Sequence, residues 1–371
     1  MLQTLAAGGC AALLPATALA QPQAAARPAT GARTDILVGR SSALSGPMAP
    51  FLQPLHEAHE AAIEDFNAQG GIGGRKVRLV TLDDGFDPKR TLENARRLVE
   101  QDGVVALFAQ AGTSQVLALL PYLERSRTPL ISVYTGSPAL HAAASPWLFT
   151  TSASYADEIG QIVRNLVSIQ STRIGIVHEN NDFGRSTLPL VEQAIAAEGA
   201  TVAGVQAMDS SGKNATEAAR ALAAAQPQAV VMLAAGPPVV AYVRAHHAHL
   251  VVPLYTLSLG AGAQVIRSLG SDARGLAVAR TTPPPRRATT QITRDFQASM
   301  KQRGLEPDYD RFRAYLDARA LLEGLRGQPG PPPPEPTSPA PWRASGGSTW
   351  EATSTASALA SGTARATWTS R

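Results

Sequence analysis

The chain has 371 residues, of which 44% are hydrophobic and 17% are charged, and its formal net charge is +4. This length exceeds what one hydrophobic core usually serves, so two domains are expected. The composition excludes a membrane-embedded or a disordered chain. Nucleic acid is not an expected partner, because the net charge is small and is not concentrated in a run of Lys or Arg.

Residues 1–20 have the pattern of a secretory signal peptide. The apolar stretch 5–19 is too short to span a bilayer, and Ala18-Leu19-Ala20 is a small-x-small cleavage pattern. We therefore expect cleavage after Ala20, a periplasmic location and a flexible leader over 21–34. Cys10, the only cysteine, could instead be a lipidation site. Cleavage would leave a mature chain without a disulfide, a thiol nucleophile or a thiolate metal site.

From Asp35 onward, short apolar runs alternate with stretches of helical periodicity. This alternation predicts an α/β fold with mainly parallel sheets and right-handed crossovers. Strands are expected first at 36–39, 77–82, 104–109 and 130–133. A second series of strands is expected at 173–177, 201–205, 229–233, 254–257 and 276–279. Helices are expected at 291–303 and 309–326.

Two early motifs could carry chemistry. The glycines of 70–74 invite a dinucleotide interpretation, but they follow a helix and precede a strand, the reverse of the order that such a site needs, so a tight turn is predicted. Asp83, Asp84 and Asp87 could bind a divalent cation, yet they lack the spacing of a calcium loop. Asp87, which stands before Pro88, is instead predicted to be the N-cap of the next helix.

Catalytic motifs are scarce in the sequence. His246, His247 and His249 do not share one helix face, and we interpret them as helix-end cations or polar surface residues rather than as a metal site. The sequence contains no G-x-S-x-G elbow, phosphate loop or zinc motif. We therefore predict no cofactor, no metal and no enzymatic activity, although a pair of acids from distant segments remains an alternative.

Two small, hydroxyl-rich turns follow neighbouring strands. They are Ala111-Gly112-Thr113-Ser114 and Tyr134-Thr135-Gly136-Ser137. In a parallel sheet both turns would lie at the carboxyl ends of adjacent strands, where ligands bind. The free N–H groups of a helix start suit a carboxylate. The alternative is that Thr113 and Ser114 only cap the following helix.

Several blocks together resemble the periplasmic solute-binding proteins of branched-chain amino acid (Leu/Ile/Val) ABC uptake systems. The blocks are SSALSGPMAPF, NAQGGIGGRKVRLVTLDDGFDPKR, RIGIVHENNDFGRSTLP and the two hydroxyl turns. The resemblance implies a type I periplasmic-binding fold, in which two α/β lobes joined by hinge crossings close on a small ligand. It also implies a monomer that delivers its ligand to an inner-membrane ABC permease. Lobe 1 would span 35–150 and 281–326, and lobe 2 would span 151–280.

The resemblance also implies where the ligand binds. Its expected contacts are Gly112, Thr113, Ser114, Tyr134, Thr135 and Gly136 in lobe 1, and Tyr155 and Phe183 in lobe 2. Leucine and valine binders place an acidic residue in the segment matching 256–259, where this chain has none. Because a buried ammonium without a counter-charge is costly, a small amide or a carboxylate without an amine suits the pocket better than an ordinary amino acid. A ligand sensor of the same fold, feeding a regulator, is the alternative function.

The stretch 327–371 departs from the family, being rich in Pro, Ser, Thr and Ala without periodicity. If the codons for 348–371 are read one nucleotide out of frame, they can encode a segment that resembles the family's C-terminal strands. We therefore expect a frameshift near 327–334, with a natural low-complexity tail as the alternative. If the chain is made as written, it could be a degenerate product that does not bind.

Overall fold

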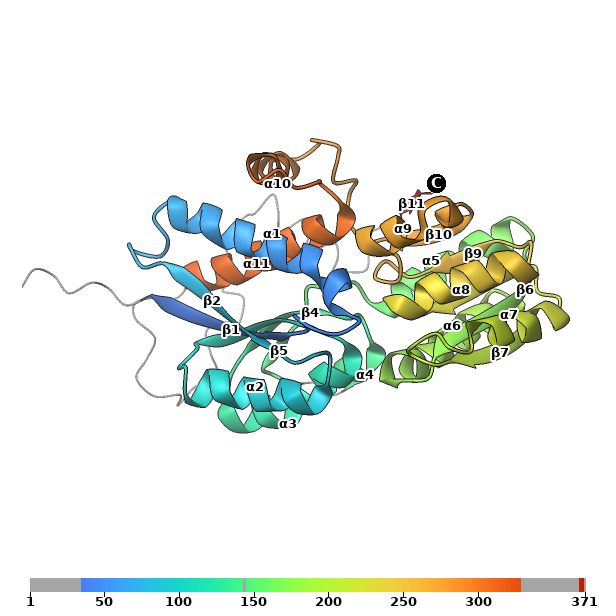
Figure 1. The fold of residues 1–371 in the computed structure, drawn as a ribbon, viewed down its shortest axis with the longest axis horizontal. Coiled ribbons are helices and arrows are strands. Elements are labelled where there is room, and N and C mark those ends of the chain that lie inside the picture. Colours follow the sequence, from blue (N-terminus) through green and yellow to red (C-terminus); the bar gives the residue numbers. More distant parts are fainter. Residues whose placement is uncertain (1–34, 143–144, 328–366, 370–371) are drawn as a thin grey trace, which may run out of the picture. The chain divides into compact units, whose positions relative to one another are not determined.

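The computed structural model describes residues 35–142, 145–327 and 367–369 (Figure 1). Their strands form two sheets, each flanked by helices, which confirms the predicted α/β class and the two predicted lobes. We call the first sheet and its helices lobe 1, and the second sheet and its helices lobe 2.

Lobe 1 contains a five-stranded parallel sheet. In spatial order its strands are β2 (Val77–Asp83), β1 (Ile36–Ser42), β3 (Ala106–Ala111), β4 (Leu130–Tyr134) and β5 (Leu148–Phe149). Its helices are α1 (Ala49–Ala68), α2 (Pro88–Glu100), α3 (Thr113–Ser126), α4 (Pro138–Ala142), α10 (Gln291–Gln302) and α11 (Tyr309–Arg326).

Lobe 2 contains a six-stranded sheet, parallel except for the last strand of the chain. In spatial order its strands are β11 (Thr367–Thr369), β10 (Leu276–Arg280), β9 (Leu254–Thr256), β8 (Ala229–Leu233), β6 (Arg173–Glu179) and β7 (Thr201–Met208). Its helices are α5 (Tyr155–Ser168), α6 (Asp182–Ala197), α7 (Ala215–Ala224), α8 (Pro237–His249), α9 (Ala263–Leu269) and the 3₁₀ turn η1 (Gly270–Ala273).

Each sheet is covered on both faces, as parallel sheets with continuous apolar strands require. In lobe 1, α1 and α11 pack on one face, with α10 against these two helices, and α2 and α3 pack on the other face (Figure 1). In lobe 2, α7, α8 and α9 cover one face, and α5 and α6 cover the other. Helices α1 and α11 lie side by side although they are far apart in the sequence (Figure 1).

Two local predictions, the cap at Asp87 and the turn over 70–74, are confirmed. Asp87 caps α2, because its carboxylate accepts hydrogen bonds from the N–H groups of Lys89 and Arg90 at 2.7 and 3.1 Å. The glycine-rich segment after α1 is a tight turn closed by paired Ile72 and Arg75.

Strand β1 is longer than the apolar pattern predicted, because polar residues extend it. Beyond Gly39 it continues through Arg40, Ser41 and Ser42, all of them buried. The guanidinium of Arg40 lies 3.1 Å from the Glu60 carboxylate, and the Ser41 hydroxyl donates to Asp84 at 2.9 Å. Partners on other elements thus let polar side chains continue a buried strand.

The signal peptide, the leader and the proposed frameshift lie outside the described residues, apart from Gly327 and the three residues of β11. Strand β11 pairs antiparallel with β10 in lobe 2. Within the described residues, no helix is both long enough and apolar enough to cross a membrane.

Candidate functional site

The turn after β3 has a backbone that only glycine fits. Gly112 has a φ of +91°, and a Cβ built on it would lie 2.0 Å from Oε1 of Gln115. Gln115 in turn donates from Nε2 to the backbone oxygen of Phe86 at 2.7 Å. The start of α3 is therefore tied to the loop that follows β2, and the first N–H groups of this helix have no partner within it.

The two hydroxyl turns meet, because β3 and β4 are parallel neighbours. Oγ1 of Thr113 lies 2.9 Å from Oγ1 of Thr135, and both residues are buried. The Tyr155 hydroxyl donates to the same Thr135 oxygen at 3.2 Å. The N-cap of α3 is Gly112, without a side-chain cap, so the interpretation of Thr113 as a mere cap is wrong.

Aromatic residues at the start of α5 and α6 complete this cluster. The rings of Tyr155 and Phe183 pack edge to face with centroids 5.4 Å apart. The Tyr155 N–H donates to the Gly136 oxygen at 3.0 Å, and a Cβ on Gly136 would lie 2.2 Å from the Ala153 oxygen. Five of the predicted residues therefore gather at one place; we call Thr113, Thr135, Gly136, Tyr155 and Phe183 the hydroxyl cluster.

The remaining predicted residues lie at the edge of the hydroxyl cluster or turn away from it. Ser114 is half-buried in the first turn of α3, beside Gly112. The Tyr134 hydroxyl points instead toward α11, where it donates to Oδ1 of Asp310 at 3.4 Å.

Glu158 is an acid that the sequence analysis missed. Its carboxylate accepts from the backbone N–H of Ser258 at 2.7 Å and from the Ser258 hydroxyl at 2.9 Å. Burial raises the pKa of Glu158 to about 7, although these hydrogen bonds oppose the shift. The segment 256–259 itself contains no acid, but α5 supplies a carboxylate to Ser258 from 100 positions away in the sequence.

A group of buried charges lies next to Glu158. Asp310, at the start of α11, accepts from the N–H of Ala263 at 2.7 Å. Arg313 pairs through Nε with Asp317 at 3.0 Å and donates to the Ser152 hydroxyl at 2.6 Å. Arg280, the last residue of β10, packs its guanidinium on the ring of Tyr309, with 4.4 Å to the ring centroid. These side chains come from both lobes.

A cavity of about 30 Å³ lies among these charges. It is lined by Tyr134, Ser258, Arg280, Thr281, Thr282, Tyr309, Asp310 and Arg313. A site of this size holds about two water molecules. It therefore has room for one polar group of a ligand. We call it the charged cavity.

The sequence carried a signal for part of this site. Arg280 directly follows the predicted strand 276–279, and the carboxyl ends of parallel strands are where ligands bind. Asp310, Arg313 and Asp317 lie at helical spacing on the predicted helix 309–326, which places them near one another. No local sequence pattern predicts that this helix lies close to Arg280.

The basic and acidic motifs considered for metals have other roles. Asp83 accepts from the N–H and hydroxyl of Ser45, and Asp84 accepts from Ser41 and Thr91.

His246 is buried, its Nε2 lies 2.8 Å from the Val252 oxygen, and burial lowers its pKa. The interpretation of His246 as a helix-end cation or surface group is therefore wrong. Among the described residues, no group of three or more His, Cys, Asp or Glu side chains could hold a metal ion.

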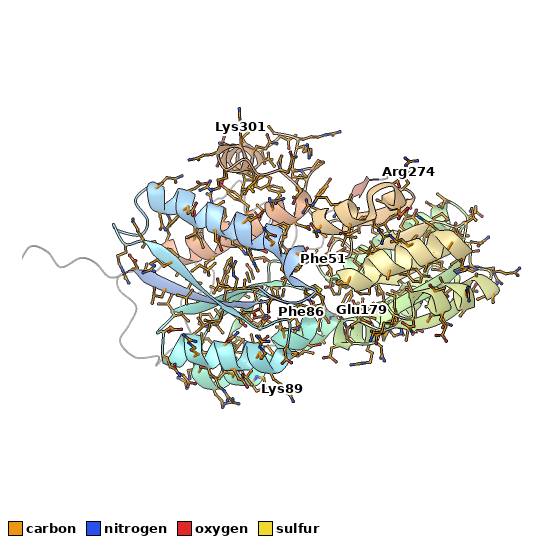
Figure 2. The ribbon with its side chains drawn as sticks, viewed as in Figure 1. Phe51, Phe86, Lys89, Glu179, Arg274 and Lys301 are labelled. Atoms are coloured by element: carbon orange, nitrogen blue, oxygen red, sulfur yellow. The ribbon has the colours of Figure 1, made fainter. Side chains whose placement is uncertain are left out.

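The basic residues outside the charged cavity include several on the surface. Figure 2 shows Lys89, Arg274 and Lys301 at the outside of the ribbon, and all three are exposed. Arg280 and Arg313 differ from them because both are enclosed by other side chains. Burying a cation is costly unless hydrogen bonds or opposite charges compensate it. The two buried arginines therefore depend on the polar groups that surround them.

Comparison with known proteins places this architecture in a family. A model of the periplasmic binding protein family matches residues 35–360. The chain is similar to the Leu/Ile/Val-binding protein of Escherichia coli K12, with 26% identity over 162 residues, 43% of this chain and 44% of that protein. It thus spans less than half of the length of this curated relative.

Solved structures agree with this assignment. A substrate-binding periplasmic protein from Ralstonia solanacearum superposes with a TM-score of 0.74 at 27% identity, over 81% of this chain and 86% of that one. A solute-binding protein of an ABC transporter from R. palustris, solved with benzoate, superposes with a TM-score of 0.70 at 16% identity, over 79% of this chain and 81% of that one. The chain therefore belongs to the periplasmic binding protein family and has its two-lobed type I fold.

Proposed function

We propose that this protein is the extracytoplasmic binding component of an ABC uptake system. Its solute would be an amino acid or a related small amide or carboxylate, bound by closure of the two lobes and passed unchanged to an inner-membrane permease. The protein would act as a periplasmic monomer after cleavage at Ala20.

The observation that supports the proposal most is the composition of the hydroxyl cluster. Thr113, Thr135 and Gly136 come from strand-end turns of lobe 1, whereas Tyr155 and Phe183 come from lobe 2. A ligand held there would contact both lobes, which is how a two-lobed binding protein couples ligand binding to closure. The Leu/Ile/Val-binding relative and the complex with benzoate suggest branched-chain amino acids and benzoate as the first solutes to test.

A thermal-unfolding screen of the full chain against amino acids, amides and carboxylates tests this proposal. A solute that binds the folded state stabilises it by about 2.7 kcal/mol at 100 times its Kd. We expect at least one compound to raise the unfolding temperature and to be recovered unchanged by mass spectrometry. Conversion of the compound would favour an enzyme, and a chain that no compound stabilises would contradict the proposal.

A further inference from the structure

Arg280 has a hydrogen-bond donor that the described structure leaves unused. Its two terminal nitrogens donate to the backbone oxygens of Ser258 at 3.4 Å and Ala261 at 3.1 Å. Among the described residues, no group accepts a hydrogen bond from Nε. Only 8% of the residue is exposed. A buried charged donor without an acceptor costs free energy, so this nitrogen indicates an acceptor supplied by a ligand.

The other charged groups of the charged cavity already have partners. Asp310 accepts from the Ala263 N–H and the Tyr134 hydroxyl, and burial raises its pKa, which favours its neutral form. Arg313 is paired with Asp317 at 3.0 Å. The Nε–H group of Arg280 is therefore the charged donor in this cavity that remains for a ligand to accept from.

Arg280 also lies beside the segment in which the resemblance places the acid of leucine and valine binders. The guanidinium donates to the backbone oxygen of Ser258 in that segment. The Ser258 hydroxyl and N–H are bonded to Glu158. Both polar groups of Ser258 are thus engaged by Glu158, and among the described residues the donor without an acceptor beside this segment is Nε of Arg280.

We propose that Arg280 binds a carboxylate of the solute in the charged cavity, so that the solute is a small carboxylate rather than a neutral amide or an amine. This inference rests on the proposed function and specifies its ligand class. The planar guanidinium matches the geometry of a carboxylate, and such charge-assisted hydrogen bonds are stronger than neutral ones. The hydroxyls of Thr281 and Thr282, which line the same cavity, can donate to the remaining lone pairs.

Compounds of matched shape separate these ligand classes. Calorimetric titration of the full chain would compare 4-methylpentanoate, 4-methylpentanamide, isopentylamine and L-leucine, together with benzoate and benzamide. We expect a carboxylate to bind at least about 10-fold more tightly than its amide. This is the effect of roughly one charge-assisted hydrogen bond.

Substitution of Arg280 supplies the second arm of the test. Arg280→Gln is expected to raise the Kd for the bound carboxylate by about 10- to 100-fold and to leave amide binding unchanged. Arg280→Lys keeps the charge and should give an intermediate Kd. The matched control is Arg244→Gln, since Arg244 also donates to a backbone oxygen in lobe 2, that of Ser268 at 2.9 Å, but is half-exposed and does not line the cavity.

The outcomes distinguish this inference from the proposed function. If an amide or amine binds as tightly as its carboxylate, or if Arg280→Gln leaves carboxylate binding unchanged, the inference is wrong and the proposed function stands. If nothing in the panel or in the wider solute screen binds, both are contradicted. If Arg280→Gln does not fold, as judged by circular dichroism, the carboxylate-to-amide ratio of the unaltered chain decides.

Discussion

Thr135 is the residue at which the hydroxyl groups of the two lobes meet. Its Oγ1 lies 2.9 Å from that of Thr113 and accepts from the Tyr155 hydroxyl at 3.2 Å. All three residues are buried. The Ser137 N–H also donates to this oxygen, at 3.3 Å. A single side-chain oxygen therefore bonds three other buried polar groups, and its removal would leave all of them without this partner.

Thr135→Val tests this role with almost no change of shape. We expect a loss of about 1–3 kcal/mol in the free energy of unfolding, because the hydroxyls of Thr113 and Tyr155 lose a buried partner. Denaturant titration measures the loss, and Thr201→Val on the exposed start of β7 is the control. A loss no larger than in the control would show that Thr135 does not hold the cluster together.

Glu158 should make stability depend on pH in a defined direction. Burial raises its pKa from 4.5 to about 7 in the folded chain, so between these values the folded state binds more protons than the unfolded state. The contribution of Glu158 to stability is therefore greatest below pH 4.5 and falls as the pH rises through about 7. The total change for this group is about 3 kcal/mol.

Glu158→Gln removes that titration. Between pH 5 and pH 8 we expect the free energy of unfolding of the variant to fall by less than that of the original chain, because a neutral amide pays no penalty for ionisation. Denaturant titrations at the two pH values measure the difference. Glu192→Gln, at an exposed position of α6, is the control. Equal pH dependence in all three chains would contradict the assignment.

Among the elements, the turn from β3 into α3 depends on two separate properties of Gly112. Its φ of +91° is unfavourable for other residues, and a Cβ would collide with the Gln115 side chain at 2.0 Å. Moving Gln115 would break its hydrogen bond to the Phe86 backbone. In a substitution of Gly112, the free-energy costs of backbone strain and of steric conflict should therefore add.

Gly112→Ala and Gly103→Ala separate these two properties. Gly103 has a φ of +68°, but nothing lies within 4 Å of a Cβ built there. We expect Gly103→Ala to cost about 1 kcal/mol from backbone strain and Gly112→Ala to cost about 1–3 kcal/mol more, measured by denaturant titration. Equal losses would mean that Gln115 moves without cost.

Most elements could be predicted from the sequence because both faces of each sheet are buried. Such strands read as continuous apolar runs, so the predicted strand 229–233 has the observed bounds of β8. Predictions fell short where polar residues continue an element, as Arg40 and Ser42 do in β1. There the strand is stabilised by partners on other elements, which a local pattern does not contain.

The site was predicted only where its residues are close in the sequence or share a strand edge. The meeting of Thr113 with Thr135 follows from the parallel pairing of β3 with β4. The contact of Glu158 with Ser258 joins residues 100 positions apart, and no periodicity reveals such a pair. Long-range polar pairs of this kind could be identified only from the three-dimensional structure.

For the whole molecule, the described contacts between the lobes differ from those within each lobe. Each sheet has apolar cores on both of its faces. Several contacts between the lobes are polar, such as Ser137 with Ser186 at 2.9 Å and Ala263 with Asp310 at 2.7 Å. Phe51 of α1, labelled in Figure 2, adds an apolar contact with the core of lobe 2. Polar contacts of this kind between units that have their own cores permit relative motion.

Closure of the two lobes on a solute is the central claim, and small-angle X-ray scattering tests it most directly. The radius of gyration of the full chain would be measured without solute and with the tightest-binding compound of the panel at saturation. We expect it to decrease, because the solute stabilises the closed form by contacting both lobes. An unchanged radius of gyration at proven saturation would contradict binding by lobe closure.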